Sequence, residues 1–437
     1  MGIIAKKIEI DFTDEKISSS AGSFFLSQMA DRLGLPEMLG EVIRLKSRQR
    51  GASDVEMMLS LIYCLAQGDG KIHDVDRLGG DDSRRQLLDL ETVPGHRRLG
   101  EYLRRFGIRS CNRLDKVARA LARQVAPSVI EHEIAEKGYL PVFVDGSGIE
   151  VSGRCFEGAG ELYDGSDGYW LHGVFVGRLW VEQRLWPGGV DVAHGWKDQL
   201  KKTAELIGPD KPVWARMDNA YYNGEVVKFC ESQGWDYSIS VTNKTYKKPL
   251  HRKREQLTYR DWKPINKKRT EWAALIYHCP SGWGRKRPYL VIRKDWDGRQ
   301  KRMFPTYVYI LLSRADLPLA ELARRHRGKQ GQENAFKGPL IELDLHHPPC
   351  RRFNANRAFY TAGQIAQMLL VAIQYQLLPE TARKHGIRTI IRDLVRTAGK
   401  LVRHARKWKL LFAKSALKLD WIAHAADRIE SMAHAPP

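Results

Sequence analysis

Three acidic residues occupy positions from which they could share a divalent cation. Asp145 follows the apolar run YLPVFV, Asp218 follows VWARM, and Glu333 lies in HRGKQGQENAFK, a segment expected to be helical. Carboxylates at the carboxyl ends of strands converge in the crevice of an α/β sheet, and a helix covering the sheet can direct a third carboxylate there. Because three such groups repel one another without a cation, we expect two Mg²⁺ ions, with Mn²⁺ as a substitute. Two ions of this kind can clamp the attacking and leaving oxygens of a displacement at phosphorus.

Each acidic residue also has a plain structural interpretation. The Asp145-Gly146 pair could be a turn, and Asp218 could be a helix N-cap. Glu333, between basic residues, could form a solvated ion pair. The segment DLHHPPC at 344–350 offers zinc-ligand types but would need further ligands that the sequence does not identify. The catalytic interpretation therefore depends on the ordered set of three, not on any one acid.

The elements around these acids predict an α/β protein with a mixed sheet. Strand-like runs at 139–144, 173–181, 213–217, 236–241 and 307–312 alternate with helical segments at 197–207 and 224–233, which is typical of a layered α/β structure. A long apolar helix is expected from about residue 353 to 378. The chain divides into five predicted parts: a helical N-terminal DNA-binding region 1–135, a core 136–242, a basic β-rich insertion 243–302, a second part of the core 303–380 with a long apolar helix, and a basic helical C-terminal region 381–437.

The charge of the chain favours a polyanionic partner. Lys and Arg number 72 against 51 Asp and Glu, which gives a formal charge of +21 and favours nucleic acid. The charge is also segregated. Residues 136–242 hold 10 basic against 16 acidic side chains, residues 243–302 hold 19 against 5, and residues 381–437 hold 13 against 4. Basic segments flanking an acidic core are expected where a cation site must be brought onto a phosphate backbone.

The remaining composition narrows the class of protein. The six cysteines are dispersed and form no C-x-x-C pair, so we expect reduced thiols in a cytoplasmic, nucleoid-associated protein. The most apolar helical stretch is interrupted by glutamines and is too short for a membrane span. The first residues, MGIIAKKIEIDF, lack the apolar segment of a signal peptide.

Around the three acids the sequence resembles a known family. The segments VFVDGSGIEV, WARMDNAYYNGEVVKFCESQGWDYSISV and HRGKQGQENAFKGPLIELDL are similar to the motifs of DDE transposases of bacterial insertion sequences, and closest to the family numbered thirteen-eighty. The resemblance implies an RNase H-like, retroviral-integrase-like core in which Asp145, Asp218 and Glu333 are catalytic and hold the metal ions. It also implies cleavage at transposon ends and joining of the 3′-hydroxyl to target DNA.

The third motif departs from the family's Tyr-Arg-Glu-Lys signature. His326, Lys329 and Leu340 stand at the Tyr, Arg and final Lys positions, and Lys337 could replace the missing Lys. These differences from the signature affect the residues expected to bind the DNA end. The residues expected to contact DNA are His326, Lys329, Lys337, Lys267, Lys268, Arg269, Arg403 and Arg406.

The sequence therefore predicts a metal-dependent DNA transposase. Its expected partners are the terminal inverted repeats of the element and the target DNA, bound by a homodimer or a higher assembly. A metal-dependent nuclease that cuts without joining is an alternative. A DNA-binding derivative that has lost catalysis is another.

Overall fold

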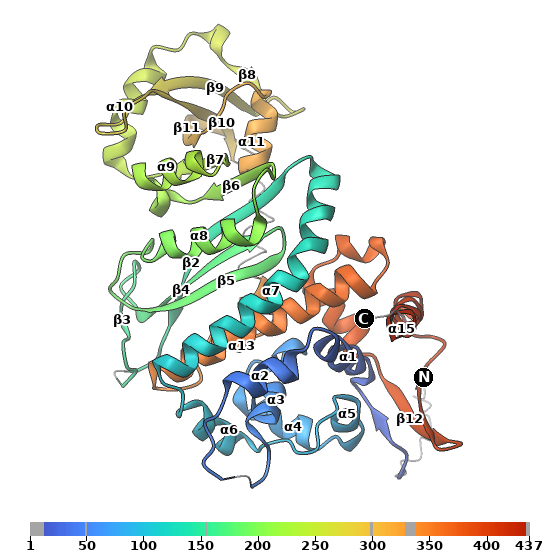
Figure 1. Ribbon diagram of the computed structural model, residues 1–437. Helices are drawn as coiled ribbons and strands as arrows, with labels where there is room; N and C mark the ends of the chain where they lie inside the picture. The colour runs from blue at the N-terminus through green and yellow to red at the C-terminus, as the bar shows by residue number, and fades with distance from the viewer. Residues whose placement is uncertain (1–12, 49, 154, 298–299, 328–337, 434–437) are drawn as a thin grey trace, which may run out of the picture.

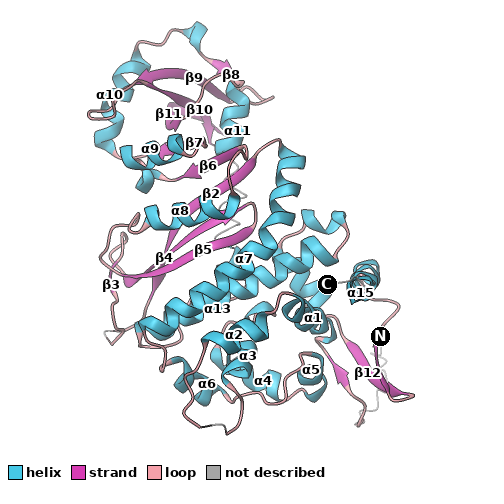
Figure 2. Ribbon diagram, in the orientation of Figure 1, coloured by secondary structure: helices cyan, strands magenta, loops and turns pink. Residues whose placement is uncertain are grey.

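The computed structural model describes residues 13–433, except for 49, 154, 298–299 and 328–337. Its centre is a ten-stranded mixed sheet with the order β3-β4-β2-β6-β7-β11-β10-β9-β8, in which β5 also pairs with β4 (Figure 2). Five of these strands surround the candidate acids: β2 (Leu140–Glu150), β4 (Asp167–Val176), β5 (Leu179–Pro187), β6 (Val213–Met217) and β7 (Asp236–Val241). Strands β5, β4 and β2 are antiparallel, whereas β2, β6 and β7 are parallel. This mixed sheet is consistent with an RNase H-like core.

The core strands form where short apolar runs end at turn residues. Strands β6 and β7 have the predicted bounds, and helices α8 (Trp196–Ile207) and α9 (Gly224–Ser232) differ from prediction by one residue each. The predicted strand 173–181 is wrong, because this run crosses a hairpin. Gly177 and Arg178 join β4 to β5, and Gly177 has a φ of 57°, which a glycine adopts without strain.

The basic insertion extends the core sheet. It begins with α10 (Lys244–Glu255), a helix that the sequence interpretation did not include. The short strand β3 (Gly160–Glu161) belongs to the core and lies at the end of the sheet opposite β8. The other strands of this half are β8 (Lys263–Pro264), β9 (Glu271–His278), β10 (Arg287–Asp297) and β11 (Gln300–Leu312). Because β11 pairs with β7 and β10 pairs with β11, the insertion and the core share one hydrogen-bonded ladder.

The N-terminal region is helical, as predicted. After the short strand β1 (Ile17–Ser18) its helices are α1 (Phe24–Arg32), α2 (Leu35–Val42), α3 (Asp54–Ala66), α4 (Val75–Gly79), α5 (Asp82–Leu87), α6 (His96–Leu103) and α7 (Ile108–Lys137). A capping box begins α3: the Ser53 hydroxyl accepts from the Glu56 amide at 3.1 Å, and the Ser53 amide donates to Glu56 at 2.7 Å.

Helix α13 (Phe353–Ala372) connects the sheet to the N-terminal helices (Figure 1). It is buried on all sides from Ala355 to Ala372, because apolar residues occur on every face of the helix. Its glutamines bond the edge strand β5: Gln364 donates to the Trp180 carbonyl at 2.9 Å, and the Trp180 amide donates to Gln367 at 3.2 Å. These bonds satisfy backbone groups that a sheet edge would otherwise leave open.

The C-terminal region differs from the predicted basic helix. Besides α14 (Ile387–Ile390) and α15 (Leu419–Ala433), it contains a hairpin of β12 (Gly399–His404) and β13 (Lys407–Phe412) that pairs with β1. Ala405 and Arg406 form the turn with φ of 47° and 66°. The helical interpretation fails because charge and apolar groups in this segment also alternate with the period of a strand.

Candidate active site

Asp145 and Asp218 lie side by side on neighbouring strands. Val144 of β2 and Met217 of β6 are partners in the parallel ladder, and each is followed directly by the acid. Asp218 keeps an extended backbone, with φ of −85° and ψ of −172°. Because side chains at matching positions of paired strands point to the same face, the two carboxylates share one face of the sheet, about 5 Å apart at the backbone.

Asp145 lies inside a strand and not at its end. The sequence interpretation ended the strand here because the Asp145-Gly146 pair is typical of a turn, yet β2 continues to Glu150. The glycines allow close packing instead. A Cβ at Gly146 would lie 3.1 Å from the His172 ring on β4, which is tighter than ordinary contact. The Asp-Gly pair is therefore a packing feature and not a turn.

Asp218 has both a capping and an electrostatic role. One of its carboxylate oxygens accepts the Ala220 amide at 2.9 Å, which caps the short helical turn Asn219–Tyr221. Burial raises the pKa of Asp218, while this amide and the positive charge of Arg216 lower it. A buried carboxylate of this kind favours a compensating positive charge nearby.

Tyr221 places a buried hydroxyl close to the acids. Its side chain is fully buried, and its hydroxyl has no hydrogen-bond partner among the described residues. Burial, together with the charges of Asp218, Asp145 and Asp191, raises the pKa of Tyr221 well above its ordinary value. The neighbouring Asp191 has a turn role, since it accepts the Ala193 amide at 2.7 Å. The two adjacent carboxylates form an oxygen-rich site that fits a hard divalent cation and its waters.

Glu333, Lys329 and Lys337 lie outside the described residues. The described chain on one side ends with α11 (Leu319–Arg327), where His326 is 5% exposed and its Nε2 lies 3.1 Å from the Ser240 hydroxyl of β7. His326 thus packs α11 onto the sheet and is not presented to solvent. Met217 pairs with Ile239, so Ser240 shares the face of Asp218.

On the other side of this segment, Gly338 and Pro339 line a groove of about 650 Å³ next to the acids. The groove also includes Phe143 and Arg216, which are ladder partners two residues before Asp145 and Asp218 and hence lie on the same face. Seven cationic side chains line it, against two acidic ones, Glu133 and Glu342; the cationic ones are Lys137, Arg178, Arg216, Arg324, Arg325, Lys384 and Arg388. The groove is therefore suited to a phosphate backbone.

The other predicted DNA contacts lie away from this face. Lys267, Lys268 and Arg269 are exposed in the turn between β8 and β9, at the outer end of the sheet. Arg403 and Arg406 are exposed on the C-terminal hairpin, beside the N-terminal helices and at the opposite end of the molecule from the insertion (Figure 1). The structure does not bring these two groups to Asp145 and Asp218.

Sequence reasoning missed Arg216 and Tyr221. Arg216 could have been found, because a residue two positions before an acid in a strand shares its face. Tyr221 is placed by the capped turn after β6, which the sequence indicated only as the start of a helix. The zinc alternative at 344–350 finds no support: among the described residues, the potential ligands that come together are those of His73, Asp76 and His96, within 4.8 Å of one another.

Comparisons with known proteins identify the family of the chain. A family model described as "Transposase DDE domain group 1" matches residues 2–434. Among solved structures, one match is a cryo-EM structure of the piggyBac transposase synaptic complex with hairpin DNA; it has 10% identity and a TM-score of 0.46, and the match covers 97% of this chain and 85% of that one. A search of curated proteins finds no match. Across its described residues the protein has no helix long and apolar enough to cross a membrane. Because the family model spans nearly the whole sequence, the chain belongs to the transposase DDE domain group 1 family.

Proposed function

We propose that this transposase cleaves DNA at the ends of a mobile element and joins the freed 3′-hydroxyl to target DNA, with Asp145, Asp218 and Glu333 holding two Mg²⁺ ions. One observation carries the proposal. The two aspartates follow a partnered residue pair on parallel strands, so their carboxylates share one face of the sheet. In a family defined by an Asp-Asp-Glu set, this is the pair that a shared cation requires.

The chain's own residues would divide the work at this face. Asp145 and Asp218 hold the divalent cations, which when bound would stabilise negative charge on the attacking and leaving oxygens at phosphorus. Arg216, buried beside Asp218, lowers the pKa of that carboxyl and so favours the charged form that a cation needs. The buried Tyr221 hydroxyl donates to a water or oxygen at the acids, which fixes its orientation. The basic groove holds the DNA backbone across the face.

Glu333 would complete the set from the segment between His326 and Gly338. The support is the position of the flanking residues: His326 contacts β7 on the face of Asp218, and Gly338 lines the groove beside Arg216. Lys329 and Lys337 on this segment contact phosphates of the element end, in place of the family's Arg and final Lys.

The proposed partners are the terminal inverted repeats and target DNA. An element has two ends, and both must be cut and joined to the target DNA in one complex, so the working form is a homodimer or a larger assembly. Lys267, Lys268 and Arg269 on the insertion, with Arg403 and Arg406 on the hairpin, extend the contact with DNA beyond the groove, because exposed cations release counterions from the phosphate backbone.

A strand-transfer assay tests the proposal. Labelled duplexes that carry the ends of the element, with plasmid target and Mg²⁺, should give cleaved ends and joined products with the wild-type protein. Asp145→Asn, Asp218→Asn and Glu333→Gln should abolish both while still binding the ends. Asp164→Asn is the matched control, since Asp164 is an exposed turn residue that accepts from Ser166.

The outcomes separate the alternatives. Cleavage without joining under all conditions would assign a nuclease. Binding without metal-dependent cleavage would assign a DNA-binding protein that has lost catalysis. Wild-type cleavage by Asp145→Asn would refute the assignment of the site.

A further inference from the structure

Two histidines and an aspartate of the N-terminal helical region come together outside the candidate active site. His73 lies in the short 3₁₀ turn Ile72–Asp74 that precedes α4, Asp76 lies in α4, and His96 is the first residue of α6. One ligand atom of each side chain lies within 4.8 Å of the other two. Imidazole nitrogens and carboxylate oxygens are the atoms by which proteins bind transition-metal ions.

Asp76 and His96 are joined by two hydrogen bonds that have a structural explanation. The His96 amide donates to one carboxylate oxygen at 2.8 Å, and His96 Nδ1 lies 2.5 Å from the other oxygen. The amide bond supplies the cap that Gly95, at the amino end of α6, has no side chain to provide. The amide bond first, and then the imidazole contact, lower the pKa of Asp76. The carboxylate is therefore charged at neutral pH, and this pair by itself requires no ion.

His73 is the residue that this pairing does not explain. Its ring stacks on the His96 ring, with 4.0 Å between the centroids and 30° between the planes. Within the described part of the chain, the His73 ring forms no hydrogen bond with a side chain or with the backbone. A second imidazole is thus held beside a charged carboxylate and a first imidazole, which is the arrangement expected of a metal ligand.

The backbones that carry the three side chains are anchored in the core. The side chains of Val75 and Leu78 on α4 and of Leu99 on α6 are all buried. The Lys71 amide donates to the Asp74 carboxylate at 3.2 Å, which fixes the turn before α4. The ligands are therefore presented by two segments whose positions are set before an ion arrives, and this reduces the entropic cost of binding.

The ligand atoms can reach coordination distance by side-chain rotation alone. Zn²⁺ binds these atoms at about 2.0 to 2.2 Å, which places tetrahedral ligand atoms roughly 3.3 Å apart. His73 and Asp76 are exposed, so their side chains can turn toward a shared ion from a separation of at most 4.8 Å. No shift of α4 or α6 is needed.

The donor atoms and the nearby charges select the cation. Mg²⁺ and Ca²⁺ prefer oxygen ligands, whereas imidazole suits Zn²⁺ and the neighbouring transition metals. The surroundings are also basic, because Arg97 and Arg98 are exposed on α6 and the Asp74 carboxylate is paired with Arg77 at 3.7 Å. A basic surface opposes an ion held by charge alone more than an ion held through bonds to nitrogen. Both observations favour Zn²⁺ over Mg²⁺.

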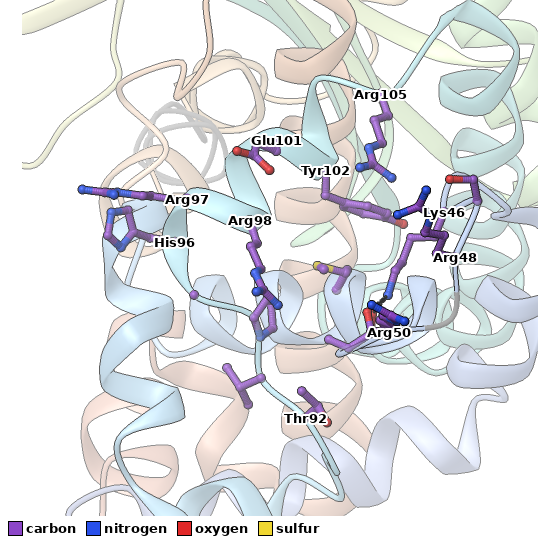
Figure 3. Close-up of a pocket in the computed structure, with 16 residues that line it drawn as sticks. Lys46, Arg48, Arg50, Thr92, His96, Arg97, Arg98, Glu101, Tyr102 and Arg105 are labelled. Atoms are coloured by element: carbon purple, nitrogen blue, oxygen red, sulfur yellow. Dashed lines mark hydrogen bonds between the residues drawn. The ribbon is translucent and has the colours of Figure 1, made fainter.

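The fourth coordination position can be filled by water. Three protein ligands leave one position of a tetrahedral ion open. His96 also lines a pocket of about 520 Å³ between residues 46–52 and α6. Figure 3 shows the His96 ring at the end of this pocket away from Lys46 and Tyr102. The pocket therefore gives a water ligand room beside the ion.

We propose that His73, Asp76 and His96 bind one Zn²⁺ ion, which clamps α4 and the turn before it to the amino end of α6. His96 binds through the nitrogen that faces Asp76, and its proton moves to the other ring nitrogen. The ion has a structural role, because a ligand that binds only the folded chain stabilises it. This site is separate from the proposed Mg²⁺ site and does not depend on the proposed catalysis.

Isothermal titration calorimetry on the full-length protein tests the site. Zn²⁺ is titrated into metal-free protein in the presence of excess Mg²⁺, which occupies sites built from oxygen alone. His73→Ala and His96→Ala should each weaken one Zn²⁺ site by at least about tenfold, because losing even an outer partner of a metal ligand costs 10- to 100-fold. His404→Ala, which removes an exposed histidine of the C-terminal hairpin, is the matched control and should keep the wild-type isotherm.

His73→Ala is the decisive variant. The His73 ring has no hydrogen bond to the rest of the described chain whose loss could unfold the region, and equal melting temperatures in EDTA verify this. Zn²⁺ should raise the melting temperature of the wild type and of His404→Ala, but not that of His73→Ala. An unchanged Zn²⁺ affinity in His73→Ala would overturn the proposal, whatever His96→Ala does, and so would a wild-type protein that binds no Zn²⁺. The titration contains no DNA, so a failure of the proposed catalysis leaves its result unaffected.

Discussion

Glu182 offers a quantitative test of the packing that holds the central sheet. It lies on β5 with 8% of its surface exposed, and its carboxylate is 4.0 Å from the Arg119 guanidinium of α7. Burial raises the pKa of Glu182 to about 7, against the charges of Arg119 and Lys202, which lower it. The carboxylate is thus buried with too little compensation, and the protonated form is favoured in the folded state.

The sign of the effect on stability follows from proton binding. Between the ordinary value of 4.5 and about 7, the folded state binds more protons at Glu182 than the unfolded state does. The free energy of unfolding therefore falls as pH rises through this window. The difference between the two pKa values corresponds to a loss of about 3 kcal/mol at pH 8, at 1.36 kcal/mol for each pKa unit.

Glu182→Gln removes the ionisation and keeps the shape. We expect the variant to match the wild type near pH 4.5 and to exceed its unfolding free energy by up to about 3 kcal/mol at pH 8. Urea denaturation at pH 5, 6, 7 and 8 measures the difference. Glu205→Gln, an exposed acid on α8, is the control and should change little. A variant that is less stable than the wild type at pH 8, or that keeps the same dependence on pH, would refute the reasoning.

Further predictions concern the buried hydrogen bonds that hold α7 against β5 and α13, and the residues expected to contact DNA. Asp115→Asn on α7 should lower the free energy of unfolding, measured by calorimetry, by about 3 to 5 kcal/mol. The reason is that the buried Asp115 carboxylate accepts hydrogen bonds from two arginines and a threonine on β5 and α13. A loss below about 1 kcal/mol would contradict this. Lys267→Ala/Lys268→Ala should weaken duplex binding and lower the salt slope by about 0.9 for each phosphate that these lysines neutralise. An unchanged slope would mean that the insertion does not contact DNA. Lys329→Ala or Lys337→Ala should reduce strand transfer at least tenfold without changing the melting temperature, since a charge-assisted hydrogen bond contributes about 1.5 to 3 kcal/mol; normal transfer in both variants would leave only a structural role.

Much of the fold could be predicted where apolar runs were short and sharply bounded. Strands β6 and β7 have the predicted bounds because each ends at polar or turn residues. The apolar helix from Phe353 was also predictable, since its composition requires burial on all sides. Its glutamines, which interrupt the apolar pattern, turned out to bond the open edge of β5.

The remaining elements depended on tertiary context. The Asp145-Gly146 pair is typical of a turn, but Gly146 and Gly148 continue β2, because neighbouring side chains fill the space that a Cβ would occupy. The C-terminal hairpin was missed because its basic and apolar residues fit both a helical and an alternating pattern. The spacing of residues in this segment fits both a helix and a strand, and pairing with β1 is what selects the strand.

The sequence predicted part of the candidate site. Asp145 and Asp218 were identified because both follow strand-like runs, but their adjacency depends on the register of two strands that are about 70 residues apart in the sequence. Tyr221 was part of the motif that follows Asp218, but no role at the site was predicted for it, since its position depends on the cap formed by Asp218.

The most direct test of the central claim locates the bound metal. Fe²⁺ placed in the protein in place of Mg²⁺ generates hydroxyl radicals with ascorbate and peroxide, and these cut the backbone next to the ion. The account predicts cuts near Asp145, Asp218 and Glu333 that excess Mg²⁺ suppresses and that Asp145→Asn/Asp218→Asn removes. Cuts confined to the neighbourhood of His73, Asp76 and His96, or the absence of cuts at both aspartates, would contradict it.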